Sequence, residues 1–206
     1  MVRRSLENIA KVSAGIEPEQ ALSLSLFARH NRAMSDPAFT LDTIKTPIGT
    51  ALIASDDQGH LRILDWEEHE ARMRRLAVRQ YKAGLHLTPG HAPAALRKQL
   101  MAYFCGDLRS IDALPCAFEG TAFQQRIWQA LRAIPAGKTL TYGALAKRLK
   151  LSPASARAVG LANGANPISV VIPCHRLIGA DGSLSGYGGG LHRKEWLLRH
   201  EGVAIA

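Results

Sequence analysis

A cysteine and a histidine lie side by side late in the sequence, in the stretch VVIPCHRLIG that starts at Val170. A thiol attacks carbon as the thiolate, and a nearby imidazole, backbone amide or positive charge lowers the pKa of the thiol. Cys174 and His175 are therefore a candidate pair for nucleophilic chemistry. The alternative is that Cys174 is an inert buried thiol, because free cysteine is among the most buried residue types.

The residues before this pair predict how it is positioned. Residues 168–172 are an apolar run typical of a buried strand, and Asn166 with Pro167 predicts a turn before it. Pro173 stops regular strand pairing, so Cys174 is expected at the end of the strand. Neighbours in an extended segment point to opposite sides, so His175 would reach Cys174 only through a turn or a bridging water.

The composition favours a partner that carries negative charge. The chain has 206 residues, 47% of them hydrophobic, and a formal net charge of +9, which suits one large domain or two small ones. Residues 138–180 contain no Asp or Glu. Their cations are Lys138, Lys147, Arg148, Lys150, Arg157 and Arg176. Such a one-sign stretch favours nucleic acid, although charge alone does not separate nucleic acid from acidic lipid.

Membrane, disulfide and metal classes have little support in the sequence. The apolar stretch ALSLSLFA near the start is too short to span a bilayer, so we expect a soluble protein without membrane attachment. Cys105, Cys116 and Cys174 show neither CxxC nor metal-ligand spacing. We therefore expect free thiols in a reducing, cytoplasmic compartment, with no metal and no cofactor.

The first part of the chain predicts an extension and a small α+β domain. Residues 1–37 have no consistent pattern and are expected to be a disordered or dispensable extension; a chain beginning at Met34 that failed to fold would contradict this. Two β-rich runs flank the turn residues 56–59, which predicts a hairpin. Residues 67–81 look helical, and a second helix carries Leu96, Leu100 and Phe104 on one face.

A second domain is predicted from residue 119 onward. Thr121 and Gln124 fit a capping box, followed by an apolar stripe of Phe123, Ile127, Leu131 and Ile134. Thr141 is the expected cap of the next helix, and Ser152 with Pro153 opens a third. Two short helices with a tight connection suggest a helix-turn-helix, the alternative being ordinary helix packing. The surrounding positive charge favours contact with phosphates.

A glycine-dense loop and a final helix follow the Cys-His pair. Residues 186–190 match neither a P-loop nor a strand-GxGxxG-helix pattern, so they are interpreted as backbone that can pass close to a flat ligand. The last helix should end at Gly202, with Trp196 and Leu197 as packing residues.

Three motifs together resemble one known family. They are PCHR at 173–176, the longer ARAVGLANGANPISVVIPCHR at 156–176, and YGGGLHRKEWLLRHEG at 187–202. This sequence resembles the O6-alkylguanine-DNA alkyltransferases, also called methylated-DNA-protein-cysteine methyltransferases, from about Phe39 to Val203. The resemblance implies an α+β fold with an N-terminal ribonuclease H-like small domain at residues 38–118 and a C-terminal winged helix-turn-helix-like domain at residues 119–206.

The family resemblance also implies an activity. Such a protein binds double-stranded DNA with alkylated bases in the minor groove, as a monomer. It flips the damaged nucleotide out of the stack, because the reacting atom is inaccessible there. It then transfers the alkyl group from O6-alkylguanine to a cysteine, in one irreversible step. Because a thioether is not readily displaced by water, each molecule should act once.

Carried over by motif, the resemblance implies roles for five catalytic residues. Cys174 would accept the alkyl group, and His175 would take the thiol proton through a water. Glu201 would orient His175. Asn166 corresponds to the family's hinge asparagine, and Tyr142 to the tyrosine that supports the flipped nucleotide and protonates the departing base.

The resemblance further implies a DNA-binding set and a substrate pocket. Arg157 would intercalate where the extruded base had been. The DNA-binding residues are Arg157, Tyr142, Ser155, Ala156, Lys150 and Arg176. The pocket residues are Pro173, Leu177, Tyr187, Gly188 and Gly189. Because some relatives have a serine where this chain has Gly188, we expect a roomier pocket, open to bulkier O6-alkyl groups or to O4-alkylthymine.

Other function classes predict different behaviour. A helix-turn-helix regulator with a structural cysteine would bind a specific duplex and give no covalent product. A non-catalytic damage binder would lack Cys174, and a cysteine hydrolase would need a turnover step for which nothing here provides. The zinc cluster of some family members and the phosphotriester-sensing domain of the regulators are missing, so no transcriptional role is expected.

Overall fold

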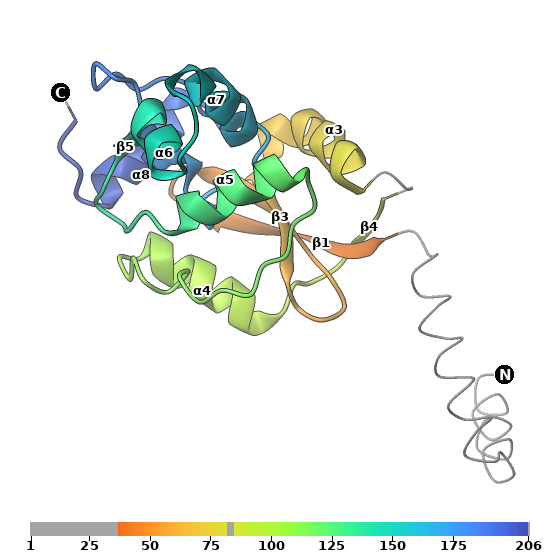
Figure 1. Cartoon of the computed structure of the whole chain (residues 1–206). Helices are drawn as coiled ribbons and strands as arrows, with labels where there is room; N and C mark the ends of the chain where they lie inside the picture. Colours follow the sequence, from red (N-terminus) through yellow and green to blue (C-terminus); the bar gives the residue numbers. More distant parts are fainter. Residues whose placement is uncertain (1–36, 82–84, 206) are drawn as a thin grey trace, which may run out of the picture. The chain divides into compact units, whose positions relative to one another are not determined.

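The computed structural model describes residues 37–81 and 85–205. The predicted extension, residues 1–37, lies outside the described residues apart from Pro37. The elements are β1 (Ala38–Thr46), β2 (Gly49–Ser55), β3 (Leu61–Trp66), η2 (Glu67–His69), α3 (Glu70–Tyr81), β4 (His86–Pro89), α4 (Ala94–Phe104), α5 (Ala122–Arg132), β5 (Leu140–Thr141), α6 (Tyr142–Arg148), η3 (Pro153–Ser155), α7 (Ala156–Gly164), η4 (Cys174–Arg176), β6 (Leu177–Ile178) and α8 (Leu191–His200). Figure 1 shows their arrangement.

A four-stranded sheet organises the first part of the fold. Its strand order is β3-β2-β1-β4, with β1, β2 and β3 antiparallel and β4 parallel to β1. The predicted hairpin between β2 and β3 is confirmed. Its turn is fixed by Asp56, whose carboxylate accepts hydrogen bonds from the amides of Gln58 and His60. The parallel pairing of β4 requires a crossover, which α3 provides.

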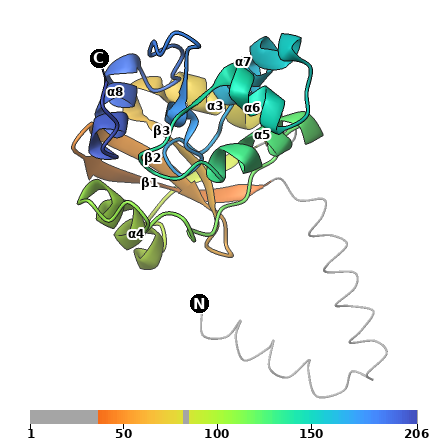
Figure 2. The same cartoon turned by 60° about the vertical axis from the view of Figure 1, so that its left-hand side comes forward.

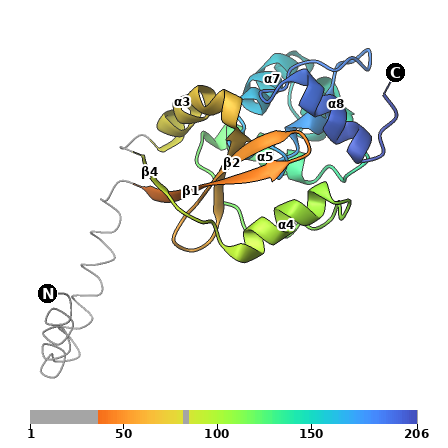
Figure 3. The same ribbon diagram turned by 180° about the vertical axis from the view of Figure 1, so that it is seen from behind.

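The two faces of this sheet are covered by different helices (Figure 3). The α3 side forms a small cluster of Phe39, Leu52, Ala54, Ile63, Met73 and Ala77. The other face belongs to a larger core that includes α4. The predicted stripe Leu96, Leu100 and Phe104 is buried there, as is Tyr103 next to it. Sequential strand residues alternate between the two clusters, as strand geometry requires.

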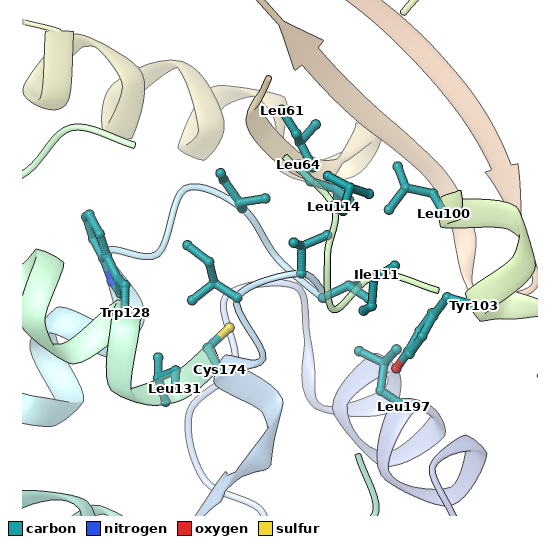
Figure 4. Close-up of a cluster of buried hydrophobic side chains, with 14 of the residues drawn as sticks. Leu61, Leu64, Leu100, Tyr103, Ile111, Leu114, Trp128, Leu131, Cys174 and Leu197 are labelled. Carbon is teal, nitrogen blue, oxygen red and sulfur yellow. The ribbon is translucent and has the colours of Figure 1, made fainter. Parts of the chain in front are cut away.

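The larger core is shared between the first and second parts of the chain. Leu61, Leu64 and Leu100 pack in it together with Trp128, Leu131 and Leu197, and Cys174 belongs to the same cluster (Figure 4). Two later segments of the chain cover the outer edge of β3. Leu61 forms a β-bridge with Cys116, before residue 119, and Leu64 forms one with Ile168, after it. The second part of the chain is therefore built against this edge.

Figure 2 shows α5, α6 and α7, the first three helices of the second part. Two of them follow the predicted capping signals. Thr121 and Gln124 form the predicted capping box of α5, and the Thr141 hydroxyl caps α6. The third helix differs from the prediction at its start, because Pro153–Ser155 form a 3-10 turn and α7 begins only at Ala156. Among the described residues, none of the helices has both the length and the apolar character needed to cross a membrane.

Candidate active site

The segment before the Cys-His pair is a buried turn, so the prediction of a strand at residues 168–172 is wrong. Asn166 closes the turn with its side chain, which accepts from the amide of Ile168 at 2.9 Å and donates to the carbonyl of Ile172 at 2.8 Å. Val170 has a φ of 71°, a left-handed conformation that no strand contains. The apolar pattern correctly predicted burial, but side-chain hydrogen bonds replace the strand ladder.

This turn delivers Cys174 to the start of the 3-10 turn η4. Cys174 is 4% exposed, and its backbone carbonyl accepts a hydrogen bond from the side-chain amide of Asn163 at 3.4 Å. Burial raises the pKa of the Cys174 thiol, while a hydrogen bond from Asn166 and the positive charges of Arg72 and Lys194 act in the opposite direction. The thiol is therefore held protonated at rest and needs a base to become a nucleophile.

His175 is buried and paired with the carboxylate of Glu201. The imidazole is fully buried, and its Nε2 lies 2.9 Å from Oε1 of Glu201. Burial lowers the pKa of His175 even though Glu201 opposes this shift, so the ring is neutral. A neutral ring beside a carboxylate carries its proton on the nitrogen that faces the carboxylate. Nδ1 is then the acceptor nitrogen, and it is buried with no hydrogen-bond partner among the described residues.

Glu201 connects His175 to Tyr103 and Arg176. Figure 4 shows where Tyr103 lies in the core, together with Cys174. Its carboxylate accepts from the Tyr103 hydroxyl at 2.7 Å, and from Nη2 and Nε of Arg176 at 2.8 and 2.9 Å. Burial alone would raise the pKa of Glu201, but the hydrogen bonds from His175 and Arg176 hold it far below its usual range. Glu201 is thus a fixed anion at the end of α8.

Arg176 does not lie on the DNA-facing surface, which corrects its predicted role as a DNA contact. Its residue exposure is 3%, and its guanidinium is ion-paired with Glu201 and hydrogen-bonded to the carbonyl of Ile134. A buried arginine of this kind neutralises the buried carboxylate rather than binding phosphate. The partner, Glu201, is distant in sequence, so the charge pattern could not separate Arg176 from the exposed cations.

Four of the five predicted pocket residues are buried. Pro173, Leu177, Tyr187 and Gly189 are buried. We call residues 179–190 the pocket loop. It is tied down by Tyr142, whose hydroxyl donates to the Ser185 carbonyl at 3.1 Å. Buried Lys194 links the loop to Leu177, because its Nζ donates to the Ser185 carbonyl at 2.7 Å and to the Leu177 carbonyl at 2.5 Å. Burial lowers the pKa of Lys194 to about 8.

The place that a side chain at position 188 would take is occupied, and the expectation of a pocket open to bulkier alkyl groups stays a prediction. A Cβ placed on Gly188 would lie 2.2 Å from Nη2 and 2.3 Å from Cζ of Arg72. The volume that glycine leaves free is thus filled by a guanidinium from α3. No sequence signal ties Arg72 to position 188, because the two residues are far apart along the chain.

The predicted DNA-facing residues lie on α6, α7 and the link between them. Lys150 and Arg157 are exposed, whereas Ser155 and Ala156 are half-buried. A groove between the two helices is lined by Thr141, Tyr142, Gly143, Ala156, Arg157, Gly160, Leu161 and Ala180. Leu161 is 71% exposed on this face. The lining of the groove therefore combines the cation Arg157 with apolar side chains such as Leu161, next to Tyr142.

Several residues of the site were not predicted. Tyr103, Lys194 and Asn163 hydrogen-bond to predicted residues, and Arg72 lies beside Gly188; only the packing of distant segments reveals these contacts. Within residues 37–81 and 85–205, no three His, Cys, Asp or Glu side chains come together in a way that could hold a metal ion.

Two family descriptions match this chain. The ribonuclease-like domain of 6-O-methylguanine DNA methyltransferase matches residues 41–118, and its DNA binding domain matches residues 122–203. The methylated-DNA–protein-cysteine methyltransferase of Salmonella typhimurium is 50% identical over 165 residues, which cover 80% of this chain and 96% of that protein. The same-named protein of Mycobacterium tuberculosis strain H37Rv is 44% identical over 162 residues, which cover 77% and 90%.

Solved structures show the same fold. The crystal structure of Mycobacterium tuberculosis OGT in complex with DNA superimposes with a TM-score of 0.65 at 39% identity, covering 79% of this chain and 93% of that one. The O6-methylguanine-DNA methyltransferase of Pyrococcus kodakaraensis gives a TM-score of 0.64 at 28% identity, covering 80% and 99%. The predicted α+β class, with a ribonuclease-like domain followed by a DNA-binding domain, is confirmed.

Proposed function

The chain belongs to the 6-O-methylguanine DNA methyltransferase family, and we propose that Cys174 is the residue that accepts the alkyl group. The protein is a methylated-DNA–protein-cysteine methyltransferase, which binds DNA and repairs it by transferring the alkyl group of O6-alkylguanine to one of its own cysteines. The observation that carries the assignment is the contact of His175 with Glu201. It leaves Nδ1 of the neutral imidazole as a hydrogen-bond acceptor, on the residue that follows Cys174 in the sequence.

In the proposed mechanism, the proton leaves the thiol through His175. Nδ1 accepts it by way of a water, and Glu201 stabilises the imidazolium that forms. Glu201 is suited to this because it is ionised and fixed by Tyr103 and Arg176. The charges of Arg72 and Lys194 stabilise the thiolate.

Transfer then proceeds as a displacement at carbon. The thiolate of Cys174 forms a bond to the alkyl carbon while the bond from that carbon to O6 of guanine breaks. The electron pair stays on the base, which takes a proton from Tyr142 as it leaves. Burial raises the pKa of Tyr142, so its hydroxyl carries a proton near neutral pH. The product is a thioether at Cys174, so the protein acts once.

Several finer features belong to the same proposal. The enzyme approaches DNA from the minor groove with α7, where Arg157 enters the stack in place of the flipped base. Lys150, Ser155 and Ala156 contact the backbone. The exposed charge of Lys150 and Arg157 supports this. Asn166 acts as the hinge between α7 and the turn that carries Cys174, which its two hydrogen bonds across that turn support.

We also propose a working unit and a location. Residues 38–118 and 119–206 are two domains that act together as a monomer, supported by a site that is assembled within one chain. Free Cys105, Cys116 and Cys174 support a reducing compartment, the cytoplasm. Transfer from O4-alkylthymine stays a prediction.

Stoichiometry tests the proposal. A fixed amount of protein is mixed with increasing amounts of duplex containing O6-methylguanine, and repaired duplex is counted. We expect a plateau at about one lesion per protein and none for Cys174→Ser. Cys105→Ser, which changes an exposed thiol, should repair like the wild type. Continued repair beyond the plateau, or an active Cys174→Ser, would refute the assignment.

A further inference from the structure

We propose that Arg72 of α3 is a positioning residue of the alkyl-transfer site, which fills the side-chain place of residue 188 and holds the pocket loop against the end of α7. The inference rests on the proposed function and adds a residue from the ribonuclease-like domain to it. The hydrogen bonds of Arg72 go to Asp65 and Gly164, so Arg72 does not carry the proton of the relay of Cys174, His175 and Glu201.

The contacts of Arg72 join three segments. Its Nη1 donates to Oδ2 of Asp65 on β3 at 2.5 Å, and its Nη2 donates to the carbonyl of Gly164, the last residue of α7, at 3.0 Å. The same Nη2 would be 2.2 Å from a Cβ on Gly188. The side chain is 19% exposed, so it lies between these segments and not in solvent.

Arg72 occupies the place where the side chain of any residue other than glycine at position 188 would begin. The backbone of Gly188 has no positive φ, so its conformation suits any residue. The three atoms nearest to the added Cβ are Nη2, Cζ and Nε of Arg72, all within 2.8 Å. A side chain at 188 and the guanidinium of Arg72 therefore compete for one volume.

The guanidinium cannot leave this volume without cost. Asp65 has a side chain that is 3% exposed, and burial raises its pKa despite the opposing charge of Arg72. Displacing Arg72 would leave this carboxyl group buried without its ion-pair partner. It would also leave the Gly164 carbonyl without this donor. The loop, the helix end and β3 are thus coupled through one side chain.

Arg72 also lies within electrostatic reach of the acceptor. Its positive charge lowers the pKa of the Cys174 thiol, and Asp65 acts in the opposite direction. Among the described residues, Lys194, Tyr142, Tyr187 and Asn166 also interact with the thiol. Removing Arg72 should therefore raise the thiol pKa as well as loosen the loop.

A double-mutant cycle tests the competition for space. Single-turnover transfer from duplex O6-methylguanine is measured for Arg72→Ala, Gly188→Ala and the double variant. Each single change should slow transfer by about tenfold, because small displacements of a reacting group are costly. The double variant should be no slower than either single one, since the added methyl group then occupies the vacated volume. Losses that multiply, or a Gly188→Ala that repairs at the wild-type rate, would overturn the proposal.

A conservative variant separates positioning from general stability. Arg72→Lys keeps a charge that can pair with Asp65, and it should keep the pH profile of the wild type while tolerating Gly188→Ala better, because an ammonium group can retreat. Arg75→Ala, an exposed change on the same helix, is the matched control and should repair normally. If Arg72→Ala does not fold, the Arg72→Lys pair still decides. The proposal is wrong if Gly188→Ala costs the same in both backgrounds.

A measurement without DNA keeps the inference separate from the proposed function. The rate of labelling of Cys174 by iodoacetamide is followed against pH by peptide mass. In Arg72→Ala the apparent pKa of the thiol should move upward, and in Arg72→Lys it should stay near the wild-type value. An unchanged profile in Arg72→Ala would contradict the inference even if repair by Cys174 is established. A shifted profile together with another alkyl acceptor would support the coupling of Arg72 to Cys174 but would refute its role as a positioning residue of the alkyl-transfer site.

Discussion

Among the single residues, Glu201 is the buried anion that the other groups of the site share. Its side chain is fully buried and holds the hydrogen bonds of Tyr103, His175 and Arg176. We expect Glu201→Gln to lose about 3–5 kcal/mol of unfolding free energy, because Arg176 stays buried without its counter-charge. Urea unfolding measures this. Glu195→Gln, which breaks an exposed pair on the same helix, should cost less than about 1 kcal/mol. Equal losses would contradict the role.

The same carboxylate predicts how stability depends on pH. The folded pKa of Glu201 lies below the ordinary 4.5, so its contribution is present above pH 4.5 and is lost as the pH falls through the folded value. The pKa of His175 is lowered from 6.5 by burial, so the unfolded chain binds a proton that the folded chain does not, and stability also falls below about pH 6.5. Unfolding from pH 8 to about pH 2 should show both slopes in the wild type. Glu201→Gln should lack the acidic one.

The sequence predicted some residues of the site and missed others for physical reasons. Cys174, His175 and Glu201 lie in recognisable motifs, and the contact of His175 with Glu201 followed from the family resemblance. The sequence predicts a DNA contact for Arg176 because cations are usually exposed, and nothing in the sequence shows that its partner is the buried Glu201. Tyr103 and Arg72 were not found, since their contacts with the site depend on the packing of α4 and α3.

At the scale of elements, the turn that carries Cys174 depends on Asn166. Asn166→Ala would leave the amide of Ile168 and the carbonyl of Ile172 buried without this partner. We expect a loss of about 2–4 kcal/mol in unfolding free energy together with a loss of repair. Thr121→Ala is the control, because it removes the cap of α5 for about 1 kcal/mol without touching the turn. Normal repair by Asn166→Ala would show that the turn needs no such closure.

Turns and helix ends could be predicted from the sequence where they depend only on a few adjacent residues. The hairpin after β2, the capping box of α5 and the cap of α6 were all read from a few neighbouring residues. The turn at residues 168–172 was read as a strand, because apolar runs mark burial and not conformation. The side chain of Asn166 and the left-handed Val170 decide the conformation there.

At the scale of the whole molecule, one core serves both parts of the chain. Side chains from β3 and α4 pack with those from α5, α8 and the turn at Cys174. We expect residues 119–206 alone to lack a cooperative thermal transition, because this fragment would expose the apolar face that β3 and α4 cover. Circular dichroism on heating tests this against the full chain. A sharp transition in the fragment would show that the ribonuclease-like part is not needed for folding.

Alkyl transfer to Cys174 is the central claim, and peptide mass tests it most directly. The protein is mixed with a duplex carrying one O6-methylguanine, digested and compared with Cys174→Ser. The site predicts one added methyl group on the peptide that contains Cys174, in stoichiometric amount, and none in the variant. A methyl group on Cys105 or Cys116, or no added mass despite tight duplex binding, would contradict it.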